Sequence, residues 1–111
     1  MEITEKAYKR CLLLKVGGRI DHETAPDLEK RFDKIFKKGQ YRLVVDLSDT
    51  GYISSAGLRA LVSALKKARR FNRGDVRLAG LSPRLKETFQ LVGFHHIFQI
   101  FDQVVDAVGS F

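Results

Sequence analysis

Apolar and polar residues along the chain follow two periods, one typical of strands and one typical of helices. Short apolar runs predict strands at residues 3–8, 11–16, 42–47, 76–79 and 97–100. Between them, apolar residues recur every third or fourth position, which predicts helices that begin near residues 25, 55, 83 and 103. Strands that alternate with helices indicate an α/β domain with a mostly parallel sheet. We expect four or five strands, with an antiparallel edge strand at the N-terminus, and about four helices.

Polar residues and glycines mark where these elements begin and end. Thr24 is expected to cap the first helix, with Pro26 in its first turn and Asp27 as an acidic capping partner. The N-caps expected for the later helices are Ser54, Ser82 and Asp102. The expected ends are Gly17-Gly18 for the second strand, Gly39 for the first helix, Asn72–Gly74 for the second and Gly93 for the third.

Each predicted helix has one apolar face, and these faces predict the core. The residues expected to point inward are Leu28, Phe32, Ile35 and Phe36; Leu58, Leu61, Val62, Leu65 and Ala68; Leu85, Phe89 and Val92; and Val104, Val105 and Val108. The strand at 42–47 is nearly all apolar, which predicts a central position with both faces covered. Core or flanking contacts are also expected for Phe71, Phe94, Phe98 and Phe101.

The composition indicates one ordered domain. With 111 residues, 44% of them apolar and 30% charged, the chain can bury a core and is too apolar to be disordered. The only cysteine, Cys11, is expected as a buried small apolar residue, and the lack of a second cysteine indicates a reducing, cytoplasmic setting. No apolar run is long enough for a membrane helix. Adjacent His95 and His96 are expected to point in opposite directions, so we expect no metal site.

The junction after the strand at 42–47 holds the most specific pattern of polar residues. Sites in parallel α/β sheets form where strands end and helices begin. Ser54 fits the N-cap of the second helix, Ser55 then lies in its first turn, and Gly57 leaves room for a partner to approach. A phosphate on Ser55 would meet free amides and the positive end of the helix dipole. The alternative is that both serines only cap the helix.

Enzymatic chemistry is disfavoured by the motifs that the chain lacks. There is no Gly-x-Ser-x-Gly sequence, and no histidine whose spacing ties it to either serine, so a serine nucleophile is disfavoured. The glycine-rich sequences that hold nucleotide phosphates are also missing. We therefore expect no catalysis and no cofactor.

The net charge of +7 indicates a basic surface, and its location decides what it means. No acidic residue lies between Asp49 and Asp75, and Arg69 is expected to snorkel at the end of the second helix. At about 100° per residue, four cations fall within an arc of roughly 60°, namely Arg59, Lys66, Arg70 and Arg73. This stripe fits a solvated face, a docking surface for an acidic partner or a nucleic-acid site. Nucleic acid is disfavoured because no interleaved aromatic residues accompany the charges.

Three ordered blocks of the sequence resemble the STAS domain, and specifically the bacterial anti-sigma-factor antagonists. Val16–Ala25 is similar to the family's Gly-x-Leu-Asp-x-x-Thr-Ala segment, which opens its first helix. Val44–Arg59 contains Ser-Ser-Ala-Gly-Leu, which resembles the family's second helix start, and Leu78–Pro83 is similar to its strand-loop-Ser-Pro segment. The resemblance covers essentially the whole chain and implies a single STAS domain over residues 1–111.

The resemblance implies a partner switch. An unphosphorylated antagonist of this family binds an anti-sigma factor that is also a serine kinase, of the GHKL type, and thereby frees the sigma factor. Phosphorylation of a serine at the helix start abolishes binding, and a serine phosphatase restores it. The resemblance places the phosphoacceptor at Ser55, with Ser54 as the alternative because the family often has aspartate there. The implied partner-binding surface consists of Asp21, His22, Thr24, Ile53, Ser54, Ser55, Ala56, Gly57 and Leu58.

Two other functions are compatible with the same resemblance. A nucleotide-binding STAS sensor would hold a nucleotide phosphate at this helix start without covalent modification. A scaffold module within a signalling assembly is the other alternative. We expect a monomer that binds neither nucleic acid nor a membrane.

Overall fold

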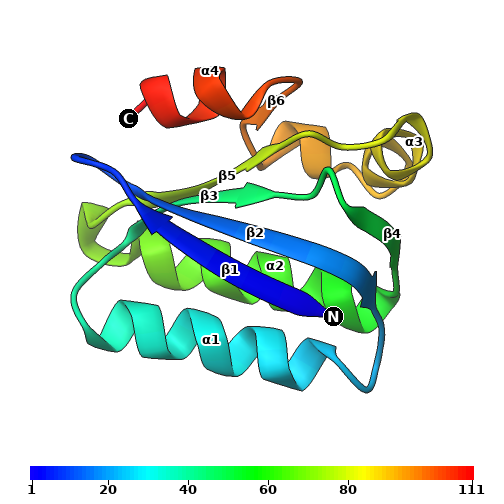
Figure 1. The fold of residues 1–111 in the computed structure, drawn as a ribbon, viewed down its shortest axis with the longest axis horizontal. Coiled ribbons are helices and arrows are strands. Elements are labelled where there is room, and N and C mark those ends of the chain that lie inside the picture. The colour runs from blue at the N-terminus through cyan, green and yellow to red at the C-terminus, as the bar shows by residue number, and fades with distance from the viewer.

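The computed structural model describes residues 1–111 as an α/β domain with a six-stranded sheet and four α-helices (Figure 1). The strands are β1 (Glu2–Ala7), β2 (Leu12–Ile20), β3 (Arg42–Asp46), β4 (Thr50–Ile53), β5 (Asp75–Ala79) and β6 (Ile100–Phe101). The α-helices are α1 (Ala25–Lys37), α2 (Ser55–Arg69), α3 (Pro83–Leu91) and α4 (Val104–Gly109), with short 3-10 helices at Arg70–Asn72 and Phe94–His96. The sheet order is β1-β2-β3-β5-β6, and only the β1–β2 pair is antiparallel. The predicted fold class is confirmed.

Strand β2 pairs with two parallel strands, one after the other. Its first half, Leu12–Lys15, pairs with β3, and its end, Gly18–Ile20, pairs with β4. The register shifts between Gly18 and Arg19, where Gly18 has a φ of +91° that favours glycine. The prediction that the strand stops at Gly17-Gly18 was therefore wrong, because the glycines allow a bulge and the strand continues to Ile20.

Strand β4 was not predicted, because long-range bonds form it rather than a local apolar pattern. The Thr50 hydroxyl is buried and donates to the Val16 carbonyl oxygen at 2.6 Å, and the Gly18 amide donates to the Asp49 carbonyl oxygen at 2.9 Å. Two of its four residues are exposed. These bonds fix the segment that leads directly into α2.

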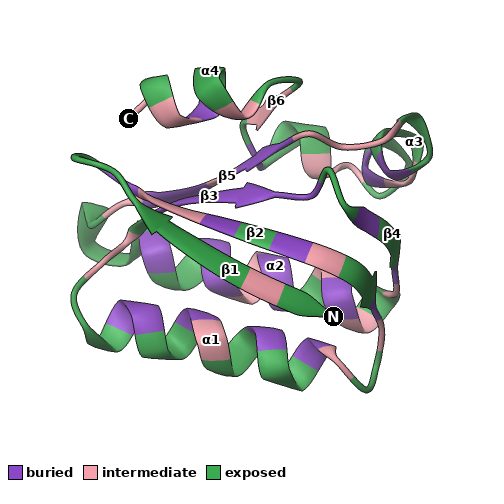
Figure 2. Ribbon diagram, in the orientation of Figure 1, coloured by how far each residue is buried: buried purple, intermediate pink, exposed green.

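The core lies mainly between the sheet and helices α1 and α2, which cover one face (Figure 1). Their buried residues form stripes that face the strands, while β3 and β5 are buried along most of their length (Figure 2). Helix α4 lies over the other face, where Cys11, Val44, Ala79 and Ala107 form a second small cluster. The predicted burial of Cys11 is confirmed, and desolvation raises the pKa of its thiol, partly opposed by the nearby charge of Arg77.

Three residues predicted to be core are exposed. Val92 lies one residue beyond the end of α3, and Val105 lies on the outer side of the short helix α4. Phe71 is 83% exposed because its φ of 58° turns it out of the helical path. The guanidinium carbons of Arg70 and Arg73 lie 5.8 and 5.7 Å from the centre of its ring.

The C-terminal elements begin later than predicted. The chain turns and bends at residues 97–98, in the segment expected as a strand, so β6 consists only of Ile100 and Phe101. Gln103, not Asp102, is the N-cap of α4, and the Asp102 carboxylate instead pairs with the Lys86 ammonium at 2.9 Å. None of the helices combines the length and the apolar character that crossing a membrane requires.

The buried Thr50 hydroxyl bond gives a direct test of how β4 is held. Thr50→Val removes the donor to the Val16 carbonyl, and we expect the free energy of unfolding to fall by about 1 to 2 kcal/mol. The control is Thr88→Val, because that hydroxyl donates to the Arg84 carbonyl on an exposed helix surface and its loss should cost less than about 0.5 kcal/mol. Urea unfolding measures both variants, and equal losses would contradict the assignment.

Candidate functional site

The start of α2 is fixed to the end of β2 by backbone bonds. The Ser54 amide donates to the Ile20 carbonyl oxygen at 2.8 Å. The Ser54 backbone is extended, and its hydroxyl accepts from the Gly57 amide at 3.3 Å, so the predicted N-cap is confirmed. The Ser54 hydroxyl is therefore already used as the hydrogen-bond acceptor that caps α2.

Ser55 is the first residue of α2, and its side chain is exposed. Its hydroxyl makes no hydrogen bond to the protein, in contrast to that of Ser54. It lies where the first amides of a helix have no intrahelical acceptor. The free hydroxyl at a helix start makes Ser55 the more accessible of the two serines for modification.

Gly57 faces the core rather than solvent. A Cβ atom there would lie 2.7 Å from both Ile20 Cγ2 and Ile53 Cγ1, closer than real side chains pack. The absence of a side chain therefore lets α2 approach β2 and β4, and the room it provides is on the inner side of the helix. Ile53 is also buried, whereas Ala56 and Leu58 are half-buried at the surface.

The turn between β2 and α1 is held by reciprocal bonds between Asp21 and Thr24. The Asp21 amide donates to the Thr24 hydroxyl at 2.8 Å, and the Thr24 amide donates to Asp21 Oδ1 at 3.1 Å. Thr24 has the N-cap position, but its side chain does not cap α1 as predicted, because it is engaged in this turn. The amide of Thr24, then that of Glu23, stabilises the ionised Asp21 carboxylate and lowers its pKa, and burial only partly opposes this.

The structure brings the two predicted segments together at one edge of the sheet. β2 leads into the turn at 21–24 and β4 leads into α2, and the ends of these strands pair side by side. Arg19 and Tyr52 are cross-strand partners there, with the guanidinium carbon 4.2 Å above the ring. His22 is exposed on the turn. The sequence did not predict the contact between Arg19 and Tyr52, since it depends on the unpredicted strand β4.

A groove runs from Ser55 along α2 toward the end of α3, and we call it the α2–α3 groove. Its volume is about 530 Å³, which is in the range of small-ligand sites. The lining residues are Ser55, Leu58, Arg59, Val62, Ser63, Lys66, Val92 and Phe94. The sequence could not reveal this groove, because Val92 and Phe94 come from a segment far along the chain.

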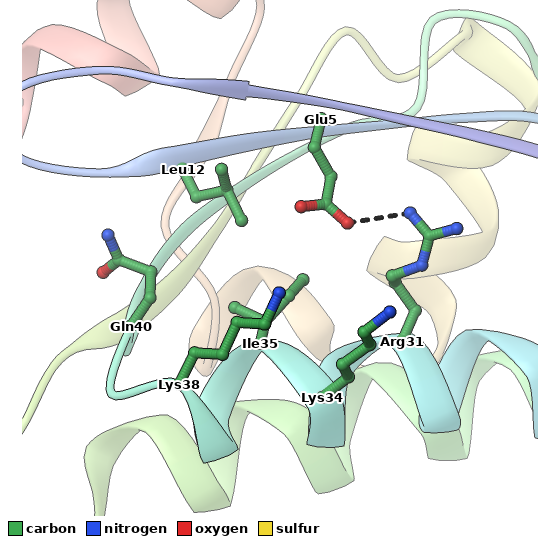
Figure 3. A pocket seen from close by; sticks show the side chains of 7 residues that line it. All are labelled: Glu5, Leu12, Arg31, Lys34, Ile35, Lys38 and Gln40. Carbon is green, nitrogen blue, oxygen red and sulfur yellow. Dashed lines mark hydrogen bonds and ion pairs between the residues drawn. The ribbon is translucent and has the colours of Figure 1, made fainter.

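A second cavity of about 460 Å³ lies between the β1–β2 hairpin and α1 (Figure 3). The Arg31 guanidinium pairs with the Glu5 carboxylate at 2.8 Å, and this contact joins the edge strand to the helix. Lys34 and Lys38 also line the cavity. None of the predicted site residues lies in it, so it is separate from the site at the start of α2.

Three of the four cations in the predicted stripe remain neighbours, since Arg59 and Lys66 line the α2–α3 groove and Lys66 and Arg70 line an adjoining hollow. α2 ends at Arg69, whose guanidinium pairs with Asp75 at 2.8 Å. Arg73 lies beyond the helix and folds back, donating to the Lys67 carbonyl oxygen at 2.9 Å while its guanidinium stacks on Tyr41. Arg73 is therefore separated from the other three cations, because the chain leaves the helix before it.

The two adjacent histidines also differ from expectation. The rings of His95 and His96 lie side by side, with their centres 3.9 Å apart, because both belong to a tight 3-10 turn. No cluster of three or more His, Cys, Asp or Glu side chains is placed to hold a metal ion.

Comparison with known proteins identifies relatives of this chain. The model of the STAS domain matches residues 2–107. BtrV of Bordetella bronchiseptica, provisionally named an anti-sigma factor antagonist, is 32% identical over 111 residues, which is 100% of this chain and 95% of that protein. The anti-sigma-B factor antagonist of Listeria monocytogenes is 34% identical over 85 residues, covering 77% of this chain and 74% of that protein.

A solved structure gives the same fold in two chemical states. The anti-sigma factor antagonist SpoIIAA matches in its unphosphorylated form with a TM-score of 0.75, 14% identity and coverage of 98% of this chain and 96% of that one. The phosphorylated form of SpoIIAA from Bacillus matches with a TM-score of 0.76, 13% identity and 98% coverage of both chains. At these identities the likeness shows the fold.

The packing of Gly57 can be tested by adding one methyl group. Gly57→Ala should lower the free energy of unfolding by about 1 to 2 kcal/mol, because overpacking outweighs the better helix propensity of alanine. Gly51→Ala is the control, since a Cβ there meets no atom within 4 Å and should change stability by less than about 0.5 kcal/mol. Thermal or urea unfolding of both variants decides, and a neutral Gly57→Ala would refute the inward packing.

The lowered pKa of Asp21 predicts a pH-dependent contribution to stability. A carboxylate whose pKa is lowered by folding stabilises the protein above the unfolded pKa of about 3.9, and the contribution is lost as the pH falls through the lower folded-state pKa. Asp21→Asn should therefore be less stable than the wild type at pH 6, and the gap should narrow as the pH falls below about 4. Urea unfolding across this range measures the gap.

The control for that experiment is Glu23→Gln, whose side chain is exposed and accepts no backbone bond in the turn. It should match the wild type at pH 6. A gap between Asp21→Asn and the wild type that stays constant from pH 6 down to pH 2 would contradict the role given to the Asp21 carboxylate.

Proposed function

Because this chain belongs to the STAS domain family, we propose that it is an anti-sigma-factor antagonist that is switched by phosphorylation of Ser55. In this proposal the unmodified protein binds an anti-sigma factor that is also a serine kinase of the GHKL type. The contact surface is formed by the start of α2 and the neighbouring turn at residues 21–24. The role is regulatory and needs no catalysis by this chain.

The observation that carries the proposal is the exposed, unbonded hydroxyl of Ser55 at the start of α2. Ser54 is less suited as the acceptor, because its hydroxyl already accepts from the Gly57 amide and caps the helix. The kinase would transfer the terminal phosphoryl group of ATP to Ser55 Oγ, which breaks the bond to the β,γ-bridging oxygen, releases ADP and gives the hydroxyl proton to a base of the kinase. A serine phosphatase would hydrolyse the ester and restore the hydroxyl.

A phosphate at Ser55 is compatible with the fold of this chain, but not with a contact surface from which a bound partner excludes water. The helix dipole and free amides favour negative charge at this position, so the modified helix remains stable. The two SpoIIAA structures support this view, since that protein is solved in its unphosphorylated and its phosphorylated form and both match the same fold. At a contact surface, however, a phosphate adds about 1.5 to 2 negative charges whose burial costs free energy unless they are paired. Binding is thus lost without unfolding.

The test compares two variants at each serine, with the purified GHKL-type anti-sigma kinases of the source organism as probes. Ser55→Ala should bind its kinase as tightly as the wild type and accept no phosphate. Ser55→Asp should bind at least about tenfold more weakly, which corresponds to 1.4 kcal/mol. Calorimetry measures the affinities, and phosphopeptide mapping after incubation with ATP locates the phosphate.

Ser54→Ala is the matched control. It removes the N-cap and should cost about 1 kcal/mol of stability, yet the protein should still be phosphorylated at Ser55. Phosphate found on Ser54 instead, or equal affinity of Ser55→Ala and Ser55→Asp, would refute the mechanism.

A further inference from the structure

The α2–α3 groove presents an apolar floor to solvent. Leu58 and Val62 supply it from α2, and Val92 and Phe94 supply it from the end of α3 and the turn that follows. Val92 is 49% exposed although it is an aliphatic residue that lines the groove with three other apolar side chains. Such a contiguous apolar surface next to a modifiable serine is typical of a place where another protein binds.

The rim of the groove is basic, and its charges are free. Arg59 and Lys66 line it, and neither makes an ion pair within the protein. Other cations of α2 are engaged, since Lys67 pairs with Asp33 at 2.7 Å and Arg69 pairs with Asp75. The chain has no acidic residue from position 50 to 74, so nothing on α2 itself neutralises the rim. The groove therefore complements a ligand that is both apolar and acidic.

We propose that the α2–α3 groove receives an acidic, amphipathic segment of the anti-sigma factor. Apolar side chains of that segment lie on the floor, and its carboxylates pair with Arg59 and Lys66. This inference rests on the proposed function and extends the contact from Ser55 to Lys66, about three turns along α2 at ~3.6 residues per turn. Continuity with Ser55, which lines the same groove, connects the two surfaces.

The arrangement also explains why one phosphate suffices as a switch. Arg59 lies four residues after Ser55, which places both side chains on the same face of α2, in the groove. A phosphate on Ser55 would attract the Arg59 guanidinium and form a charge-assisted pair with it. The acidic segment would then lose a cationic partner and meet a like charge at the mouth of the groove. Both effects weaken binding.

A nucleic acid fits this groove less well than a protein segment. Binding to a duplex depends on several phosphate contacts, and the groove offers only two free cations beside an apolar floor. The experiment keeps duplex DNA as an alternative outcome.

The experiment measures the affinity of groove variants for the GHKL-type anti-sigma kinase that binds the wild-type chain. Each affinity is measured from about 50 to about 300 mM salt, because exposed charges become screened over this range. Combined Arg59→Glu and Lys66→Glu should weaken binding about tenfold or more at low salt, with a smaller effect at high salt. Val92→Ser should weaken it several-fold at all salt concentrations. Circular dichroism confirms that each variant is folded.

Two matched controls lie outside the groove. Lys30→Glu reverses an exposed helical charge on α1, and Leu91→Ser polarises a side chain that is 81% exposed but does not line the groove. Both should bind within about twofold of the wild type, as expected for surface substitutions away from a contact.

The outcomes separate this inference from the proposed function. If the wild type binds the kinase and Ser55→Asp weakens binding, while the groove variants bind as tightly as the controls, the groove is not the docking site and the proposed function stands. If no such kinase binds the wild type, both are overturned. Binding to a generic DNA duplex that depends on the same groove residues would replace the acidic segment by nucleic acid and overturn the inference.

Discussion

The consecutive pairing of β2 with two parallel strands is the constraint on which the site depends. β3 pairs with β2 only as far as Lys15, and β4 pairs with the end of β2 from Gly18 to Ile20, with a register shift after Gly18. At the end of β2, the Ile20 carbonyl oxygen accepts a hydrogen bond from the Ser54 amide. The Arg19 carbonyl oxygen accepts one from the Thr24 hydroxyl at 3.1 Å. One strand end therefore positions both the start of α2 and the turn before α1.

Much of the fold could be predicted because its information is local. The apolar faces of α1 and α2 and the continuous run in β3 each lie within one segment, and they predicted the central strand and the covering helices. β4 could not be predicted in this way, since the buried Thr50 hydroxyl bonds to Val16, which is 34 residues away in the chain. The exposure of Phe71 escaped prediction for a related reason, because it follows from a left-handed backbone and not from hydrophobicity.

The candidate site was predictable in part. Helix-capping chemistry identified Ser54 and Ser55, and the structure distinguishes them, since only Ser54 is engaged in a cap. The room provided by Gly57 was assigned to the wrong side of the helix, because spacing alone does not show which way a residue faces. Val92 was assigned to the core from its helical period, yet α3 ends before it and leaves it in the α2–α3 groove. The sequence does not show how α2 and α3 lie relative to each other, and the groove depends on that arrangement.

The rigidity of the start of α2 determines how a modification there can act. The Ser54 amide is bonded to β2 and Gly57 is packed against two isoleucines, so the helix start has little freedom to move. A phosphate would therefore change charge and hydration on a fixed surface, lowering the net charge only from +7 to about +5.

Fields at a protein surface are screened within about 8 Å at physiological ionic strength. Arg69 lies 14 residues further along the helix, about 21 Å away, and is engaged by Asp75. In the proposed switch, the cation placed to respond to the phosphate is Arg59, because it lies one turn from Ser55 and lines the same groove.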